Sequence, residues 1–183
     1  MKRESSYTEI FVKVIAWLAV IGGAFGVLSG LICGPLFLLM PNIYANMPNF
    51  PPESAAAMGR MMHLEAILVL VMLPFHGAGV AAGVGMLRLR TWGRSLMEGL
   101  AWAGLALVAA ITGYVLFGLD FSAIFPMPMA PGMDPAAHAQ AMAVMNTFMK
   151  AASAASALFW GLILGLVLWF LRKAPTRACF KAR

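Results

Sequence analysis

The run Val14–Met40, VIAWLAVIGGAFGVLSGLICGPLFLLM, decides the fold of this chain. It contains no charged residue and exceeds the roughly 20 apolar residues that cross a bilayer. Gly22, Gly26, Gly30 and Gly34 recur in it at four-residue intervals. Residues four apart lie on one face of a helix, so these glycines form a stripe of overlapping GxxxG steps. We therefore predict a membrane-spanning helix that packs through its glycines against another helix.

The composition places the whole chain in a membrane. Apolar residues make up 62% of the 183 residues and charged residues only 11%, and the mean hydropathy is +0.85. No soluble domain of this size buries so much apolar surface, so lipid must be the solvent. We predict an all-α, four-helix membrane bundle that forms a single domain, residues 1–183, with spans at about 14–40, 66–87, 97–119 and 151–171.

The distribution of basic residues predicts the topology. The net charge is +6, and the chain has 13 Lys and Arg residues. Arg60 and Lys150 lie in the outer segments, and the others flank the spans on the opposite side: Lys2, Arg3, Lys13, Arg88, Arg90, Arg94, Arg172, Lys173, Arg177, Lys181 and Arg183. Basic residues accumulate in cytoplasmic loops, so we expect a multi-pass protein of the bacterial inner membrane with both termini in the cytoplasm. This placement argues against a nucleic-acid-binding surface.

Prolines and helix caps predict the two outer connections. The segment 41–52 holds four prolines and is predicted to be an extended loop, with the second helix starting near Ser54. The second outer loop, 120–133, ends at Asp134 and Pro135, a capping side chain followed by a proline at the first helical position. Both helices begin well before their spans, so we expect their first turns to project outside the bilayer.

The fourth helix carries a second stripe of small residues. Ser153, Ala157, Gly161 and Gly165 repeat the four-residue interval of the first span. Small residues at this interval let two helices approach closely in lipid. We therefore expect the first and fourth helices to form the closest pair.

Methionine is concentrated in the outer segments. Ten of the fifteen methionines lie there: Met47, Met58, Met61, Met62, Met127, Met129, Met133, Met142, Met145 and Met149. One face of the fourth helix, at spacings of four, three and four residues, carries His138, Met142, Met145 and Met149. The start of the second helix carries Met58, Met61, Met62 and His63.

These methionines have two interpretations. In the first, the projecting starts of the second and fourth helices pack on each other, with Met as an adaptable apolar filler. In the second, thioether sulfur and imidazole bind Cu(I), for which both are suitable ligands. Zinc is not expected, because no cysteine lies in these segments.

His76 lies near the middle of the second predicted span. Ionisable residues at this depth are rare and usually face the interior of a bundle. Glu65 precedes His76 by eleven residues, so both lie on one helix face. The same face carries Met62, Met72 and Gly83. It is either a polar track for a proton, an ion or a small ligand, or the place of a neutral histidine bonded to a carbonyl freed by the nearby proline.

The sequence holds no set of residues that indicates catalysis. There is no phosphate-binding glycine loop, no nucleophile with a base and no CxxC pair, and Cys33 and Cys179 fall on opposite sides of the membrane. We expect a non-enzymatic accessory, assembly or interaction protein without a cofactor. Its partners would be the lipid bilayer and a membrane protein or further copies of itself. The alternatives are Cu(I) handling at the outer face and a small transporter that uses His76 and Glu65.

Overall fold

The structure is a computed structural model that describes residues 2–46, 52–121 and 134–181. Within these ranges it is all-α, as predicted, and its helices are α1 Lys2–Ala45, α2 Pro52–Leu87, α3 Thr91–Phe117, α5 Pro135–Arg172 and α6 Ala174–Lys181. The first four are long and apolar enough to cross a membrane. The expected four-span membrane protein is therefore confirmed at the level of its helices.

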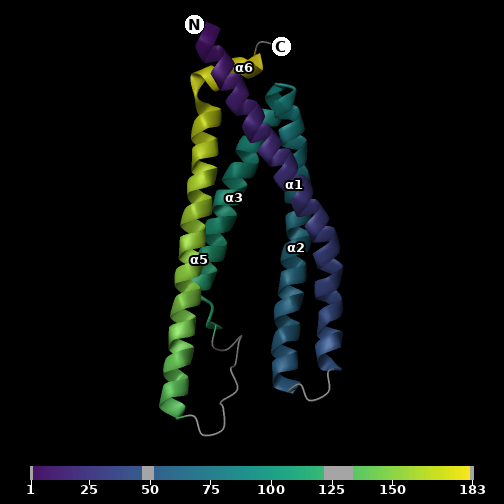
Figure 1. Cartoon of the computed structure of the whole chain (residues 1–183), viewed down its shortest axis with the longest axis vertical. Coiled ribbons are helices and arrows are strands. Elements are labelled where there is room, and N and C mark those ends of the chain that lie inside the picture. The colour runs from purple at the N-terminus through teal and green to yellow at the C-terminus, as the bar shows by residue number, and fades with distance from the viewer. Residues whose placement is uncertain (1, 47–51, 122–133, 182–183) are drawn as a thin grey trace.

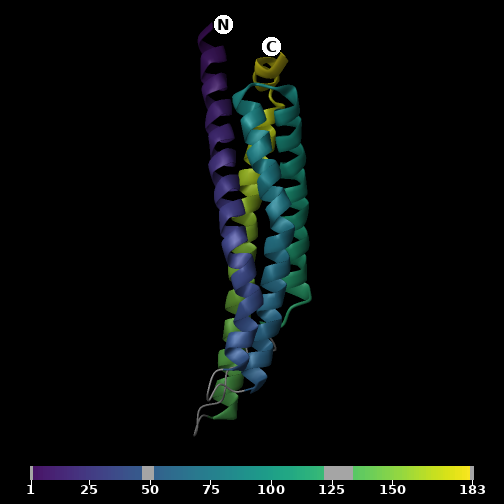
Figure 2. The same cartoon turned by 90° about the vertical axis from the view of Figure 1, so that its right-hand side faces the viewer.

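The four long helices form two pairs that meet at one end. We call the end that holds the start of α1, the α2–α3 turn and α6 the basic end, and the opposite end the loop end. Figure 1 shows α1 beside α2 and α3 beside α5, with both chain termini at the basic end. The pairs approach each other at the basic end and diverge toward the loop end. Figure 2 shows that all four helices follow one long axis.

The pairing of the helices differs from the prediction. The most extensive helix contact joins α1 to α2, and α1 makes no comparable contact with α5 in the described residues. The expectation that the first and fourth helices form the closest pair is therefore wrong. The physical reason is that the glycines of α1 receive large side chains of α2, among them His76 and Leu73, rather than a second stripe of small residues.

The helix ends follow the predicted signals in one place and depart from them in another. Asp134 caps α5, because its Oδ1 accepts a hydrogen bond from the Ala136 N–H at 3.0 Å, and Pro135 is the first helical residue, as predicted. In contrast, α1 continues through Pro41 to Ala45, so the loop expected from residue 41 starts later. Pro41 lies against Gly59 of α2, where a Cβ built on the glycine would be 3.6 Å from Cβ of the proline.

The α2–α3 turn brings two helix backbones into contact. The N–H of Arg90 donates to the Gly85 carbonyl and that of Leu89 to the Met86 carbonyl, both at 2.9 Å, which is the Schellman pattern of a helix end. Leu89 has φ 52°, a left-handed conformation in which glycine is usual. A Cβ built on Gly93 would lie 2.5 Å from the Gly85 carbonyl carbon, so only glycine allows this approach.

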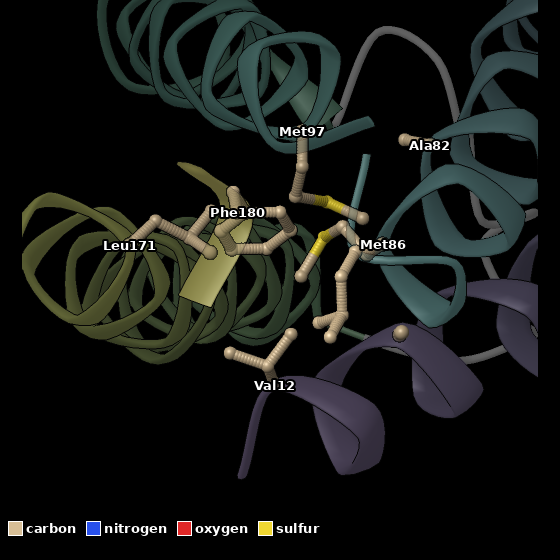
Figure 3. Packing of buried hydrophobic residues seen from close by; sticks show 8 residues of the cluster. Val12, Ala82, Met86, Met97, Leu171 and Phe180 are labelled. Carbon is tan, nitrogen blue, oxygen red and sulfur yellow. The ribbon is translucent and has the colours of Figure 1, made fainter. Parts of the chain in front are cut away.

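The buried core lies at the basic end and includes a helix that the sequence did not predict. Figure 3 shows Phe180 of α6 beside Leu171 of α5 and near Met97 of α3, with Met86 of α2 and Val12 of α1 around them. Phe180 is 1% exposed. Thus α6 lies across the end of the bundle and closes it with a buried aromatic ring.

Candidate functional site

The first candidate site is the contact between the glycines of α1 and His76 of α2. A Cβ built on Gly26 would lie 2.5 Å from Cγ and Nδ1 of the His76 ring. One built on Gly23 would lie 2.7 Å from the His76 carbonyl oxygen, and one on Gly30 would lie 2.9 Å from Cδ2 of Leu73. These glycines therefore form the hollow in which His76 and Leu73 are seated.

The contact line on α1 is offset from the predicted stripe. A Cβ on Gly22 would meet nothing within 4 Å, whereas Gly34 lies 3.5 Å from Cγ1 of Val69 by the same measure. Gly23 takes the place that Gly22 was expected to have. Eleven residues separate Gly23 from Gly34, which is close to three full turns, whereas a strict four-residue stripe drifts around the helix. The eleven-residue spacing from Gly34 was the signal in the sequence that identifies Gly23 as a contact residue.

The intramembrane polar face of α2 is packed against α1. Gly83 approaches the Ala16 carbonyl oxygen, where a Cβ would lie at 2.7 Å, and His76 is seated on Gly26. The ring nitrogens of His76 make no hydrogen bond within the described residues, so the bond to a carbonyl freed by Pro74, one of the two alternatives for this histidine, is absent there. Glu65 is partly buried on the same helix. Helix α1 therefore covers this face of α2 at His76 and at Gly83.

The outer methionines form two separate sets. Met58, Met61 and Met62 are half-buried on α2, and His63 beside them has Nδ1 2.8 Å from the Gly59 carbonyl oxygen. The set on α5, also half-buried along one face, is His138, Met142, Met145 and Met149. Met47, Met127, Met129 and Met133 lie outside the described residues.

The predicted contact between the two methionine sets is wrong. The starts of α2 and α5 continue past the end of α3, but they lie apart at the loop end (Figure 1). The reason is that the two helix pairs are joined at the basic end, so their separation increases toward the loop end. Within the described residues, no three His, Cys, Asp or Glu side chains gather at a possible metal position. Among the described residues, each set of methionines therefore lies on a single helix.

The second candidate site is a groove between α3 and α5, of about 450 Å³ and open on one side. Half of its lining is small: Thr112 of α3 and Ala152, Ser153, Ser156 and Ala157 of α5. Two of its hydroxyls are bound to their own helices, because Thr112 donates to the Val108 carbonyl at 2.7 Å and Ser153 to the Met149 carbonyl at 2.9 Å. These two hydroxyls are therefore satisfied within the protein, and the remaining lining is mostly apolar.

The predicted small-residue stripe of α5 divides between two surroundings. Ser153 and Ala157 line the groove, whereas a Cβ on Gly161 or Gly165 would meet nothing within 4 Å. These two glycines contact no helix of the described chain closely. The four small residues of the predicted stripe therefore do not form one common contact surface.

Helix α2 also presents an apolar face, which is buried at the basic end and exposed toward the loop end. At helical spacing this face of α2 carries Leu64, Leu68, Val71, Phe75, Ala82 and Met86. Ala82 and Met86, at the basic end, are fully buried. At mid-length, Gly104 of α3 fits against Phe75 of α2. Toward the loop end the same face is open, and Leu64, Leu68 and Val71 are 66%, 43% and 57% exposed.

In comparisons with known proteins, no protein-family model, no curated protein and no solved structure matches the chain.

Proposed function

We propose that the protein is a non-enzymatic accessory or assembly subunit that binds an apolar helix of a membrane-protein partner in the groove between α3 and α5. The observation that carries this proposal is the lining of the groove. Helix–helix contacts in lipid are rich in small and hydroxyl-bearing residues, which let backbones approach. Five such residues line the groove, Thr112, Ala152, Ser153, Ser156 and Ala157.

The arrangement of the two helix pairs supports the same proposal. The apolar face of α2 that fills the core at the basic end continues toward the loop end without a covering helix from the described residues, as the exposure of Leu64 and Val71 shows. A partner helix between the pairs would extend the packing of the basic end along the full length of the bundle.

We also propose that the basic end is cytoplasmic and that the membrane is the bacterial inner membrane. The support is the excess of Lys and Arg at the end that holds both termini and the α2–α3 turn. Reporter fusions after residue 2 and after residue 180 test this orientation, and a periplasmic signal from either would contradict it.

Photo-crosslinking tests the proposed groove. A photoreactive residue at position 156 should capture a partner protein in native membranes, whereas one at Leu162, outside the groove lining, should capture mainly lipid. The substitution Ala152→Leu fills the groove and should reduce the captured partner at least fivefold.

Ala155→Leu provides the matched control, because Ala155 is also exposed on α5 but does not line the groove. It should leave capture unchanged. Equal capture from positions 156 and 162, or equal loss with both leucine variants, would overturn the proposal.

A second candidate function, Cu(I) binding, is favoured by the methionine face of α5. His138, Met142 and Met145 are half-buried on one side of this helix within three turns, and thioether and imidazole groups suit Cu(I). Competition with a chromogenic Cu(I) chelator tests this function. The double substitution Met142→Leu/Met145→Leu should abolish binding with little loss of stability, while Met58→Leu/Met61→Leu on α2 should not. A wild-type protein that takes no Cu(I) from the chelator would exclude it.

A further inference from the structure

Three cations gather where α5 turns into α6. Arg172 is the last residue of α5, Lys173 forms the corner and Arg177 lies in α6, and all three side chains are exposed. We call these three residues the corner cluster. They follow directly on the last apolar span, so they lie at the level where the hydrocarbon of a bilayer gives way to its headgroups.

The corner cluster is held in place by the fold. Phe180, one turn beyond Arg177 in α6, is buried against Leu171 and Met97 (Figure 3). Thr176 in the first turn of α6 is also buried, at 1% exposure. Arg177 therefore belongs to a docked helix, and Arg172 and Lys173 lie directly before it at the end of α5, so all three have backbones that are fixed relative to the bundle.

Two of the cations lie over tryptophan rings on the sides of the bundle. The Arg172 guanidinium lies 5.5 Å from the ring centre of Trp102, and the Lys173 ammonium lies 3.3 Å from that of Trp169. Both rings are more than half exposed, at 51% and 60%. Tryptophan at this level marks the membrane interface, so the two cations extend sideways along the bundle toward the surrounding lipid.

No carboxylate of the described residues pairs with the corner cluster. At this end, Glu9 pairs with Lys13 at 2.8 Å and Glu98 with Arg94 at 3.4 Å, each within its own helix. The corner cations have no ion pair among the described side chains. Arg88 and Arg90, both exposed in the α2–α3 turn, add positive charge to the same end.

We propose that the corner cluster binds the headgroup of an anionic phospholipid. A phosphodiester offers the oxygen acceptors that a guanidinium and an ammonium prefer. The tryptophan rings that flank the cations would border the upper part of the acyl chains. Each cation near a membrane surface strengthens attraction to anionic lipid by roughly fivefold, so the cluster selects phosphatidylglycerol over the zwitterionic phosphatidylcholine. This inference is independent of the partner helix proposed for the groove.

Lipid retention by the purified full-length protein tests the proposal. The protein is incubated in neutral detergent with equal amounts of phosphatidylglycerol and phosphatidylcholine, and the lipid that remains bound is counted by native mass spectrometry. The wild type should retain phosphatidylglycerol at least tenfold more than phosphatidylcholine. Arg172→Gln/Lys173→Gln should reduce this preference by roughly tenfold or more.

Two further variants separate lipid binding from a loss of structure. Arg177→Gln changes an exposed side chain that has no partner in the described residues, so it should lower the preference severalfold without affecting thermal stability. Arg60→Gln/Lys150→Gln removes the same number of charges near the loop end and should leave the preference unchanged.

Three results would overturn the proposal. The first is equal retention of the two lipids by the wild type. The second is an equal loss of preference in Arg60→Gln/Lys150→Gln and in the corner variant. The third is displacement of phosphatidylglycerol by millimolar inorganic phosphate, which would indicate a site for a free anion rather than a lipid headgroup.

Discussion

Alanine substitutions at three neighbouring glycines of α1 test whether the contact with α2 holds the fold together. Gly22→Ala, Gly23→Ala and Gly26→Ala add the same methyl group to the same helix. Their surroundings differ: the new Cβ meets nothing within 4 Å at Gly22, the His76 carbonyl oxygen at 2.7 Å at Gly23, and the His76 ring at 2.5 Å at Gly26. Differences in stability therefore report the contact and not helix propensity.

The magnitudes follow from two opposing effects. Replacing Gly by Ala inside a helix contributes up to about 1 kcal/mol, so Gly22→Ala should be neutral or slightly stabilising. Overpacking costs about 1–3 kcal/mol. Gly23→Ala should be the most destabilising variant, because the atoms it meets include the backbone of α2, which cannot turn aside. Gly26→Ala meets only a side chain and should cost less.

Thermal unfolding in detergent measures this order. A change of 1 kcal/mol corresponds to about 2–4 °C for a chain of this length, so Gly23→Ala and Gly22→Ala should differ by several degrees. In the double variant Gly26→Ala/His76→Ala the ring is absent, and the second substitution should restore part of the loss. If Gly23→Ala is as stable as Gly22→Ala, the glycines of α1 do not form the contact described above.

Three further predictions concern the two ends of the molecule. Phe180→Ala should lower the unfolding free energy by about 3 kcal/mol or less, because α6 can undock on its own, and should speed tryptic cleavage within α6; unchanged cleavage would mean that the ring does not hold the helix. Asp134→Ala removes a cap worth about 1 kcal/mol to the first turn of α5. Because that turn can fray without unfolding the bundle, the change should accelerate amide hydrogen exchange at Ala136 and leave the melting temperature unchanged; a lower melting temperature would show that the start of α5 supports the whole bundle. Burial and then the charge of Glu9 raise the pKa of the Cys179 thiol from 9.0, so Glu9→Gln should speed its alkylation at pH 8 in a protein that lacks the other cysteine. Since the thiol has a higher pKa when α6 is docked, its contribution to the free energy of docking is complete below pH 9 and declines as the pH rises above that value. An alkylation rate unaffected by Glu9→Gln would contradict the electrostatic part of this account.

The features predicted correctly from the sequence are those that depend on one segment at a time. Run length and composition predict the spanning helices, and the Asp134–Pro135 pair predicts the start of α5. The pairing of helices was not predictable in this way, because a stripe of small residues shows that a helix is approached closely but does not identify its neighbour. Here the neighbour presents His76 and Leu73, which fill the hollows that glycines leave.

Three other differences have local causes. Proline breaks helices in water, but Pro41 lies inside α1, at a place where α1 packs closely on Gly59 of α2. The eight residues of α6 are too few and too polar to be recognised as a helix before the packing of Phe180 in the core is known. For the candidate sites, the sequence identified His76 and the residues of the α5 face, whereas the groove depends on the distance between α3 and α5.

The joint between the two helix pairs has a mechanical consequence. From Phe75, which lies against Gly104 of α3, about 35 Å of α2 extends toward the loop end at 1.5 Å per residue. At such a lever arm a rotation of about 5° at the joint moves the start of α2 by roughly 3 Å. With the contact between Phe75 and Gly104 as the pivot, a shift smaller than a side chain near the basic end is therefore magnified at the loop end.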